Sequence, residues 1–370
     1  MLCSWYPTPE KPLNGIFCRD LAHLISERFT ISVVYIHYSG DVSEPAIFKH
    51  EKPDFTEWEI VIPRKHGLFG FFYHQFHYYR LLFECLKSLE NLKIIHAQVT
   101  WKSGFDAIWL RRKFRLPVVI TEHNTDWLPE DGQSPRWKRR LSRWALFRSQ
   151  SVVAVSQRLA DALSIAIHKP VAFIPNAVHK TFTDEPRMVF PPQNKPVFIH
   201  VSNFNIKQKQ TDKIIHVFSQ FARKQPTAIL ELNVPEQAFY AYKAANPQHD
   251  WTRIHWLAPT PNRRELADRI QRAHYLVSFS LYETFGLTIA EAVCLGVPVI
   301  YTHCKGADAL IAENMGIACD ARSEASLLRA FIMAAETTDW NYEEIAGKAK
   351  SLFSGDAVLD AYSDIYRKIK

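Results

Sequence analysis

One stretch, residues 274–303, constrains the fold of this chain more than any other. It opens with HYLVSFS, a short apolar run rich in Tyr, Val and Phe, as expected of a buried strand. A turn containing Gly286 follows, and apolar residues then recur with a helical period until Gly296 and Pro298 end the helix. The next run, 297–301, is again apolar. The segment therefore predicts a strand, a helix and a second strand, which is a βαβ unit.

The start of the predicted helix is suited to binding an anion, because the first N–H groups of a helix have no partner within it. Glu283 and Glu291 lie about two helical turns apart, so both can face one ligand. Carboxylates accept hydrogen bonds from hydroxyl groups, so the pattern indicates a ligand with both phosphate and sugar hydroxyls. Without further context, the two glutamates would instead be a charge favoured by the helix dipole and a solvated helix residue. The expected anion contacts are the backbone N–H groups of Thr284, Phe285, Gly286 and Leu287.

The complete string SLYETFGLTIAEAVCLGVPVI, residues 280–300, resembles the hallmark segment of retaining, nucleotide-sugar-dependent glycosyltransferases of family 4, including those that make bacterial polysaccharides. The resemblance implies the α/β architecture called GT-B, in which two Rossmann-like, doubly wound domains face each other across a cleft. It also implies that the second domain holds most of the donor.

Length and composition agree with a two-domain protein. A chain of 370 residues is too long for one ordinary core and suits two domains. No apolar run approaches the roughly 18 residues that span a bilayer. The six cysteines show no CxxC spacing and no signal peptide is recognisable, so we expect reduced thiols and a cytoplasmic protein.

The basic residues are concentrated in the first half. Residues 1–190 carry 25 Lys and Arg against 19 Asp and Glu, or +6, whereas the remaining residues carry 20 against 19, or +1. Within 136–148, Trp137, Leu141 and Trp144 fall at i, i+4 and i+7 among five arginines and one lysine, which predicts a basic amphipathic helix. Such a helix binds an anionic membrane or nucleic acid, or docks on its own domain with its charges in water.

The order of apolar runs predicts two parallel sheets. In the first half, strand-like runs at 31–37, 93–99, 117–123 and 151–156 alternate with helical patterns. A helical stripe of Phe72, Phe76, Tyr79 and Phe83 is interpreted as core packing. A Pro-rich segment then interrupts all periodicity before the second half repeats the alternation. The predicted organisation is an acceptor-side domain at 1–185, a linker at 186–195, a donor-binding domain at 196–350, and a C-terminal helix at 351–370 that packs back on the first domain.

Two residues of the first domain match family site positions. Gly15 lies in the loop after the first strand, where the family has a glycine beside the donor phosphates and the acceptor. His123 ends the strand PVVITEH and matches the histidine that contacts the donor sugar. Glu122 is either the partner that orients His123 or a surface charge. Only MLCSW stands where the family has its first strand, so either this strand is short or the natural start differs.

The second domain departs from the family at its phosphate grip. The family has an arginine followed by a lysine, whereas this chain has Asn203 at the arginine position. Lys209, or Lys207 in a shifted register, would supply the cation. Asparagine brings no charge, so we expect the helix start at 284–287 to bind more of the diphosphate than usual.

The predicted reaction is transfer of a sugar, with retention, from a UDP- or GDP-sugar to a saccharide or lipid-linked saccharide acceptor, in glycan or cell-envelope polysaccharide synthesis. The resemblance implies that Glu283 binds the sugar hydroxyls, Glu291 the ribose, and His123 the sugar. No metal or other cofactor is expected.

Two other functions remain open: a catalytically impaired module that binds nucleotide-sugars or polyanions, and a nucleotide-sugar epimerase. The basic first domain predicts peripheral contact with an anionic membrane at the inner face of the cytoplasmic membrane, and no nucleic-acid partner is expected. The donor base and sugar, the acceptor and the oligomeric state are not readable from the sequence.

Overall fold

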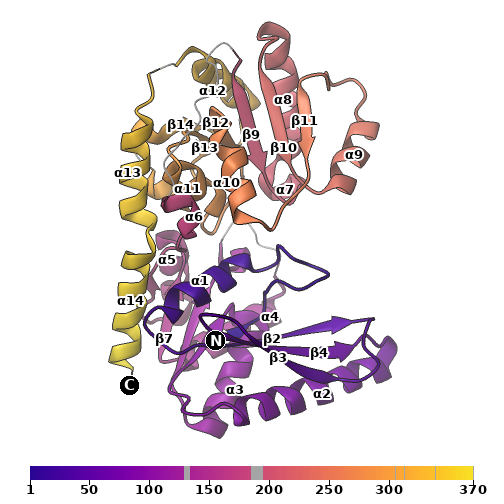
Figure 1. Cartoon of the computed structure of the whole chain (residues 1–370), viewed down its shortest axis with the longest axis vertical. Coiled ribbons are helices and arrows are strands. Elements are labelled where there is room, and N and C mark those ends of the chain that lie inside the picture. The colour runs from indigo at the N-terminus through magenta and orange to yellow at the C-terminus, as the bar shows by residue number, and fades with distance from the viewer. Residues whose placement is uncertain (129–133, 185–194, 305, 312, 338, 370) are drawn as a thin grey trace. The chain divides into compact units, whose positions relative to one another are not determined.

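The chain folds into two compact units, which Figure 1 shows in a computed structural model. The structure describes residues 1–128, 134–184, 195–304, 306–311, 313–337 and 339–369. Met1–Ile174 and Val358–Lys370 form the first unit, and Pro175–Ala357 forms the second. The sequence-based boundaries were 185 and 351 instead, and residues 186–194 of the expected linker lie outside the described part.

The first unit contains an eight-stranded sheet in the order β3-β4-β2-β1-β5-β6-β7-β8. Neighbouring strands are parallel, except that β3 pairs antiparallel with β4. Its strands are β1 (Leu2–Cys3), β2 (Ser32–Ser39), β3 (Ala46–Glu51), β4 (Thr56–Pro63), β5 (Ile95–Gln98), β6 (Val118–Glu122), β7 (Ser151–Ala154) and β8 (Ala172–Phe173). Although β1 has only two residues, it lies centrally and pairs with both β2 and β5.

The helices of the first unit connect these strands and include one from the end of the chain. They are α1 (Ile16–Ser26), α2 (Gly67–Lys87), α3 (Phe105–Phe114), α4 (Arg136–Arg148), α5 (Gln157–Ile167) and the short η1 (Thr100–Gly104) and η2 (Thr125–Trp127). Most of α14 (Gly355–Lys368) belongs to this unit. The Tyr366 hydroxyl lies 2.6 Å from Nδ1 of His96, and the Tyr362 hydroxyl lies 3.1 Å from Oγ1 of Thr121. Helix α14 therefore covers one face of β5 and β6.

The second unit has a fully parallel sheet in the order β11-β10-β9-β12-β13-β14. Its strands are β9 (Val197–Val201), β10 (Ile229–Asn233), β11 (Ile254–Leu257), β12 (Tyr275–Ser278), β13 (Val299–Thr302) and β14 (Gly316–Cys319). Its helices are α6 (Lys180–Thr183), α7 (Ile206–Lys209), α8 (Thr211–Lys224), α9 (Glu236–Ala245), α10 (Arg263–Gln271), α11 (Leu287–Cys294), α12 (Glu324–Glu336), α13 (Tyr342–Phe353), η3 (Ala307–Leu310) and η4 (Glu313–Met315). The predicted βαβ unit is β12-α11-β13, and the predicted pair of Rossmann-like folds is confirmed.

The core of the second unit is aromatic where β9 meets α8 and α12. The rings of Phe198, Phe218, Phe221 and Phe331 contact one another with centroid distances of 5.0 to 5.9 Å. All four side chains are fully buried. These contacts fix β9, and with it the loop that follows β9, against two helices.

The interpretation of the α2 stripe as core was wrong. Phe72 and Phe76 are 61% and 64% exposed, and Tyr79 is 40% exposed. The buried residues of α2 lie mainly in its C-terminal half, at Leu81, Leu82, Cys85 and Leu86. A helical period shows which residues share a face, but not whether another element covers that face. Within the described ranges, no helix is long and apolar enough to cross a bilayer.

Candidate functional site

Helix α11 begins directly after a glycine in the left-handed region. Gly286 has φ +88° and ψ 56°, a conformation that costs glycine little and other residues more. No described residue accepts a hydrogen bond from the N–H groups at 284–287. Phe285 is buried, and its ring packs edge-on against Phe353 at 5.9 Å, so this residue offers its backbone rather than its side chain. The anion expected at these N–H groups stays a prediction.

The structure brings together the predicted cation and the predicted sugar-binding carboxylate. The Lys209 ammonium forms an ion pair with Oε1 of Glu283, and the Ser280 hydroxyl donates to the same oxygen at 2.7 Å. Both ion-pair side chains are largely buried, with 21% of Lys209 and 9% of Glu283 exposed. A hydrogen-bonded pair in such a site is held more firmly than one in water.

A short helix places Lys209. Asn205 caps α7 by accepting from the N–H groups of Lys207 and Gln208. The Gln208 carbonyl accepts from the N–H of Leu281 at 2.8 Å, which joins α7 to the loop carrying Glu283. Lys207 is exposed on the same helix. Of the two lysines considered from the sequence, Lys209 is thus the one at the glutamate.

Asn203, which stands at the arginine position of the family, lies exposed in the loop between β9 and α7. Its Oδ1 accepts from the N–H of Asn205 at 3.2 Å, and Phe204 between them has φ +62°. The side chain therefore shapes the turn before α7. Its role toward a diphosphate stays a prediction.

Glu291 is not a solvated helix residue, because it is buried on α11 with 1% exposure. Nη1 of Arg263 donates to its Oε1 at 2.9 Å, and the guanidinium lies 5.9 Å from the ring centroid of Phe182. Arg263 is the first residue of α10, where Asn262 caps the helix. Sequence reasoning missed this cation, because the adjacent Arg264 has the same chemistry and only the fold shows which arginine faces α11.

His123 lies buried just after β6, in the first unit. Its Nε2 is 2.8 Å from Oε1 of Gln98, and its ring packs 4.5 Å from that of Phe17. Burial lowers the pKa of His123 to about 3, so the ring is neutral at pH 7. A neutral ring with Nε2 donating to Gln98 is fixed in orientation.

The open question about Glu122 is answered by its backbone contacts. Its carboxylate accepts from the N–H groups of Thr100, His123 and Asn124 at 3.2, 2.9 and 2.8 Å. Burial raises the pKa of Glu122, and these hydrogen bonds oppose that rise. Glu122 thus organises the loops after β5 and β6, and it is neither a surface charge nor the partner of the His123 ring.

A buried polar chain extends from His123 toward α14. Nε2 of Gln98 lies 3.0 Å from Nε2 of His96, which also contacts Oγ1 of Thr121 at 2.8 Å. Nδ1 of His96 contacts the Tyr366 hydroxyl. Gln98 and Thr121 face each other in the register of β5 and β6, so strand pairing brings these groups together.

Gly15 is required by the protein's own backbone. It has φ +66°, and a Cβ there would lie 2.3 Å from the carbonyl carbon and oxygen of Trp5. The close approach that the glycine permits is therefore to the loop after β1. Contact with donor or acceptor stays a prediction.

Each half of the chain matches a known protein family. Residues 15–182 match the family Glycosyltransferase Family 4, and residues 182–350 match the family Glycosyl transferases group 1. The chain belongs to the family 4 glycosyltransferases. Among the described residues of this glycosyltransferase, no group of three His, Cys, Asp or Glu side chains could hold a metal ion. Independence from metals stays a prediction.

Two curated relatives resemble this glycosyltransferase. It is 23% identical over 242 residues to the N-acetyl-alpha-D-glucosaminyl L-malate synthase of Bacillus anthracis. It is 24% identical over 239 residues to one component of the phosphatidylinositol N-acetylglucosaminyltransferase of Homo sapiens. Each alignment covers 62% of this chain, but 62% and 48% of the relatives. The matches thus span less than two thirds of either relative.

Solved structures show the fold. The sucrose-phosphate synthase of Thermosynechococcus elongatus superposes with a TM-score of 0.76 at 17% identity, over 95% of this chain and 92% of that one. A trehalose-phosphate synthase of Burkholderia xenovorans in complex with glucose-6-phosphate gives 0.78 at 11% identity, over 99% of both chains. A protein from E. coli bound with UDP-2-fluoro glucose gives 0.78 at 10%, over 100% of this chain and 99% of that one. The fold of the glycosyltransferase is GT-B.

Proposed function

We propose that this chain is a retaining glycosyltransferase, which moves a sugar from a nucleoside diphosphate sugar to a hydroxyl of a saccharide or lipid-linked acceptor in glycan synthesis. The observation that carries the proposal is the buried Lys209–Glu283 ion pair beside the start of α11. A cation and a row of N–H groups suit a diphosphate, and the adjacent carboxylate suits sugar hydroxyls.

The transfer breaks the bond between the anomeric carbon and a diphosphate oxygen, and the electron pair leaves with the diphosphate. The acceptor oxygen forms its new bond to the same face of the anomeric carbon, and its proton passes to the departing diphosphate oxygen. Lys209 and the N–H groups at 284–287 would stabilise the charge that develops there. Glu283 would bind the sugar and His123 would position it, so neither forms a covalent intermediate.

The relatives favour particular donors. One curated relative is named as part of an N-acetylglucosaminyltransferase, and the other as an N-acetylglucosaminyl malate synthase. One structural neighbour was solved with a UDP-sugar analogue. We therefore place UDP-N-acetylglucosamine and UDP-glucose first among the donors to be tried.

The test begins with thermal unfolding in the presence of UDP-, GDP-, ADP- and CMP-sugars, because a ligand of the folded state raises the melting temperature. The donor that binds is then assayed for sugar transfer. Glu283→Gln should reduce transfer at least 100-fold, whereas Glu236→Gln, an exposed control on α9, should leave it unchanged. If no donor binds or turns over with any acceptor, a non-catalytic binding module is the better description.

We further propose that the first unit docks on an anionic membrane, where a lipid-linked acceptor would be found. The N-terminal half of α2 exposes an unusual set of apolar side chains, including Phe69 at 92% and Leu68 at 72%. Ring contacts continue this aromatic surface through Tyr79 to Trp109 of α3. Large contiguous apolar surfaces of this kind mark interaction sites.

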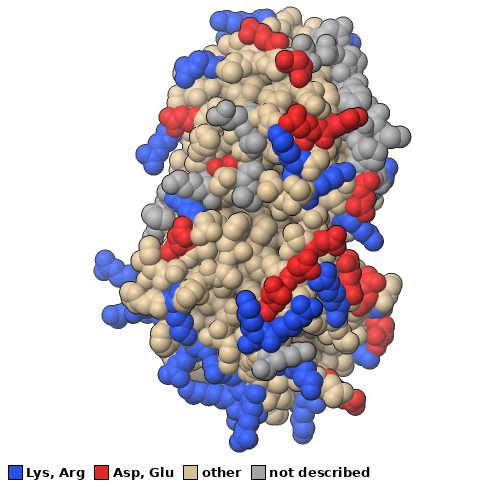
Figure 2. All heavy atoms as spheres, turned by 90° about the vertical axis from the view of Figure 1, so that its left-hand side faces the viewer, with Lys and Arg blue, Asp and Glu red and all other residues tan. Residues whose placement is uncertain are grey.

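Basic residues accompany the exposed aromatic rings. On α4, Trp137 and Trp144 are exposed, and the buried residues of that helix are Ser142, Ala145 and Leu146. A hollow of about 430 Å³ beside the ends of α3 and α4 is lined by four cations and no carboxylate. These cations are Arg111, Arg112, Arg148 and Lys169. Figure 2 shows Lys and Arg side chains gathered at the lower end of its view. Exposed aromatic and basic groups together suit an anionic lipid surface.

Co-sedimentation with phosphatidylglycerol vesicles tests the docking. Binding should weaken as salt rises, and the double variant Phe69→Ser/Phe72→Ser should lose at least tenfold in affinity. Phe48→Ser, an exposed phenylalanine on β3, is the matched control. Protein that stays in the supernatant at low salt would contradict the proposal.

A further inference from the structure

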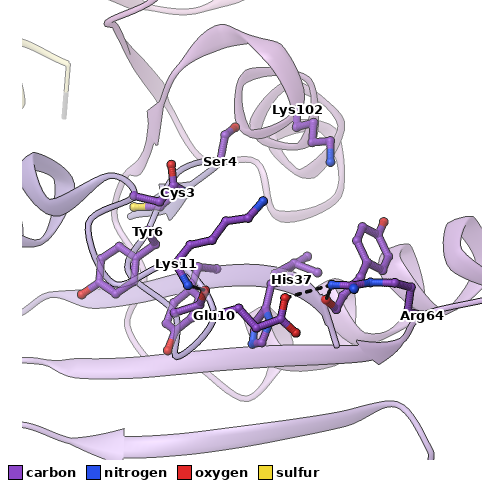
Figure 3. Close-up of a pocket in the computed structure, with 13 residues that line it drawn as sticks. Cys3, Ser4, Tyr6, Glu10, Lys11, His37, Arg64 and Lys102 are labelled. Carbon is purple, nitrogen blue, oxygen red and sulfur yellow. Dashed lines mark hydrogen bonds and ion pairs between the residues drawn. The ribbon is translucent and has the colours of Figure 1, made fainter. Parts of the chain in front are cut away.

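A second cavity, of about 260 Å³, opens in the first unit at the carboxyl ends of β4, β2, β1 and β5 (Figure 3). The carboxyl edge is where parallel doubly wound sheets bind ligands. All four strands contribute, because lining residues end or follow β1, β4 and β5 and lie mainly in the second half of β2. The charged groups that line the cavity are Glu10 and Lys11 from the loop after β1, Arg64 after β4, and Lys102 in η1.

Positive charge predominates among the charged side chains that line this cavity. Figure 3 shows Lys11, Lys102 and Arg64 reaching toward it from three different elements. Against these three cations stands one carboxylate, Glu10, which leaves a formal charge of +2 among the Lys, Arg and Glu side chains. The ammonium groups of Lys11 and Lys102 form no hydrogen bond or ion pair with any residue that the structure describes, and that of Lys102 lies 5.8 Å from the centroid of the Tyr38 ring. Two of the three cations are therefore available to a ligand.

Lys102 is held at the cavity by an unusual backbone. Its φ is +68° and that of Val99 is +72°, values that side-chain-bearing residues rarely adopt. The Ser4 hydroxyl donates to the Trp101 carbonyl at 2.6 Å and accepts from the N–H of Ser103 at 3.0 Å, so the strained turn is fixed from both sides of Lys102. Strain that surrounding contacts maintain is typical of functional loops.

Arg64 is oriented by its neighbours. Its Nη2 donates to Oε2 of Glu10 at 2.9 Å and to the Tyr38 carbonyl at 3.0 Å. The Arg64 and Glu10 side chains are both more than one third exposed, so a ligand anion can replace Glu10 at small cost. Neutral polar side chains complete the lining, at Ser4, Thr8, Asn14 and Tyr38.

We propose that this cavity binds an anionic, hydroxyl-bearing acceptor whose phosphate or carboxylate group contacts Lys102, Arg64 and Lys11. The inference rests on the proposed sugar transfer, since it names the class of molecule that receives the sugar. Arginine presents parallel N–H donors to such an anion, and lysine adds a point charge. The neutral polar side chains match the hydroxyl groups of the same molecule.

Isothermal titration of the whole chain without donor tests the site. The probes are glucose 6-phosphate, malate, inorganic phosphate, uncharged glucose, and a short-chain, water-soluble phosphatidylinositol. At least one anionic, hydroxyl-bearing probe should bind. The substitutions Lys102→Gln and Arg64→Gln should each lower the affinity for that probe at least tenfold. Lys93→Gln, an exposed lysine before β5, should bind like the unsubstituted chain. The phosphatidylinositol and glucose 6-phosphate titrations distinguish a lipid headgroup from a soluble sugar phosphate.

The donor-induced rise in melting temperature separates the two proposals. It should persist in Lys102→Gln, because the cavity residues are distinct from the proposed donor contacts. If no anionic probe binds at millimolar concentration, or if Lys102→Gln and Arg64→Gln bind every probe unchanged, the anion site is refuted while sugar transfer can still be measured. If no donor binds, but the unsubstituted chain binds an anionic probe and both Lys102→Gln and Arg64→Gln lose that binding, the cavity assignment stands and the proposed function fails.

Discussion

Two residues that the sequence assigned to different parts of a donor contact each other directly. Lys209 was expected at the diphosphate and Glu283 at the sugar, yet their charged groups form one ion pair. Each charge stabilises the other in a site that is largely removed from water. The pair is thus a preformed polar contact at which the sugar and the phosphates of one donor would meet.

Substituting Lys209→Met should affect both stability and binding. Glu283 would remain buried with only the Ser280 hydroxyl among the contacts described above, which we expect to lower the free energy of unfolding by about 3 kcal/mol. The donor-induced rise in melting temperature should disappear. Urea unfolding and thermal shift measure the two effects, and the double variant Lys209→Met/Glu283→Gln should regain stability without regaining binding. A single variant that binds donor normally would show that Lys209 does not hold the diphosphate.

His123 should make the protein less stable in acid. Its pKa is about 3 in the folded chain and about 6.5 when unfolded. Between these values the unfolded state binds the extra proton, so stability falls as the pH drops below about 6.5. From pH 7 to 4.5 the unsubstituted chain should lose about 2–3 kcal/mol more than His123→Gln. Urea unfolding at both pH values measures the difference, and equal losses would mean that folding does not lower the pKa of His123.

At the scale of elements, the junction between β1 and α1 requires a glycine at position 15, because there is no room for a Cβ atom there. A methyl group there would collide with the Trp5 carbonyl, and φ is +66° as well. Gly40 is a matched control, because a Cβ at that position would meet nothing within 4 Å. Gly15→Ala should lose about 2–4 kcal/mol of stability in thermal or urea unfolding, and Gly40→Ala less than about 0.5. Equal stability of the two variants would show that the loop after β1 can move away.

The strands and helix α11 were predictable because their patterns are local. The run HYLVSFS, the glycine turn and the helical period of 287–295 specify β12 and α11 without reference to the rest of the chain. Whether an apolar face is covered depends on distant elements, so the exposed aromatic residues of α2 were misjudged. The sequence located residues such as Lys209 by position in a motif, but the fold supplied their partners.

Side-chain contacts between different strands, and between different helices, could not be predicted from the sequence. Gln98 meets His123 because β5 and β6 pair in one register, and a shift of one residue would turn it to the other face of the sheet. Arg263 meets Glu291 because α10 packs beside α11. Neither contact has a spacing signal in the sequence. The ion pairs and polar chain of the candidate site therefore required the structure.

At the scale of the whole molecule, the units should respond separately to a change in α14. Tyr366→Phe removes the hydroxyl that contacts Nδ1 of His96, a buried ring whose pKa is strongly lowered by burial. Losing this hydrogen bond should cost the first unit about 1–3 kcal/mol. Hydrogen exchange should quicken in β5 and β6 but stay unchanged in β9 to β14. Tyr240→Phe, on the surface of α9, is the control, and equally faster exchange in both units would contradict the prediction that the effect stays in the first unit.

The return of the chain to its first unit has a consequence for folding during synthesis. Val358–Lys370 emerges from the ribosome only after the entire second unit has been made. Until then, the face of β5 and β6 that carries His96 and Thr121 lacks the two tyrosines that complete it. The second unit is a continuous segment and can fold as soon as it emerges. The unit translated first is therefore the one that finishes folding last.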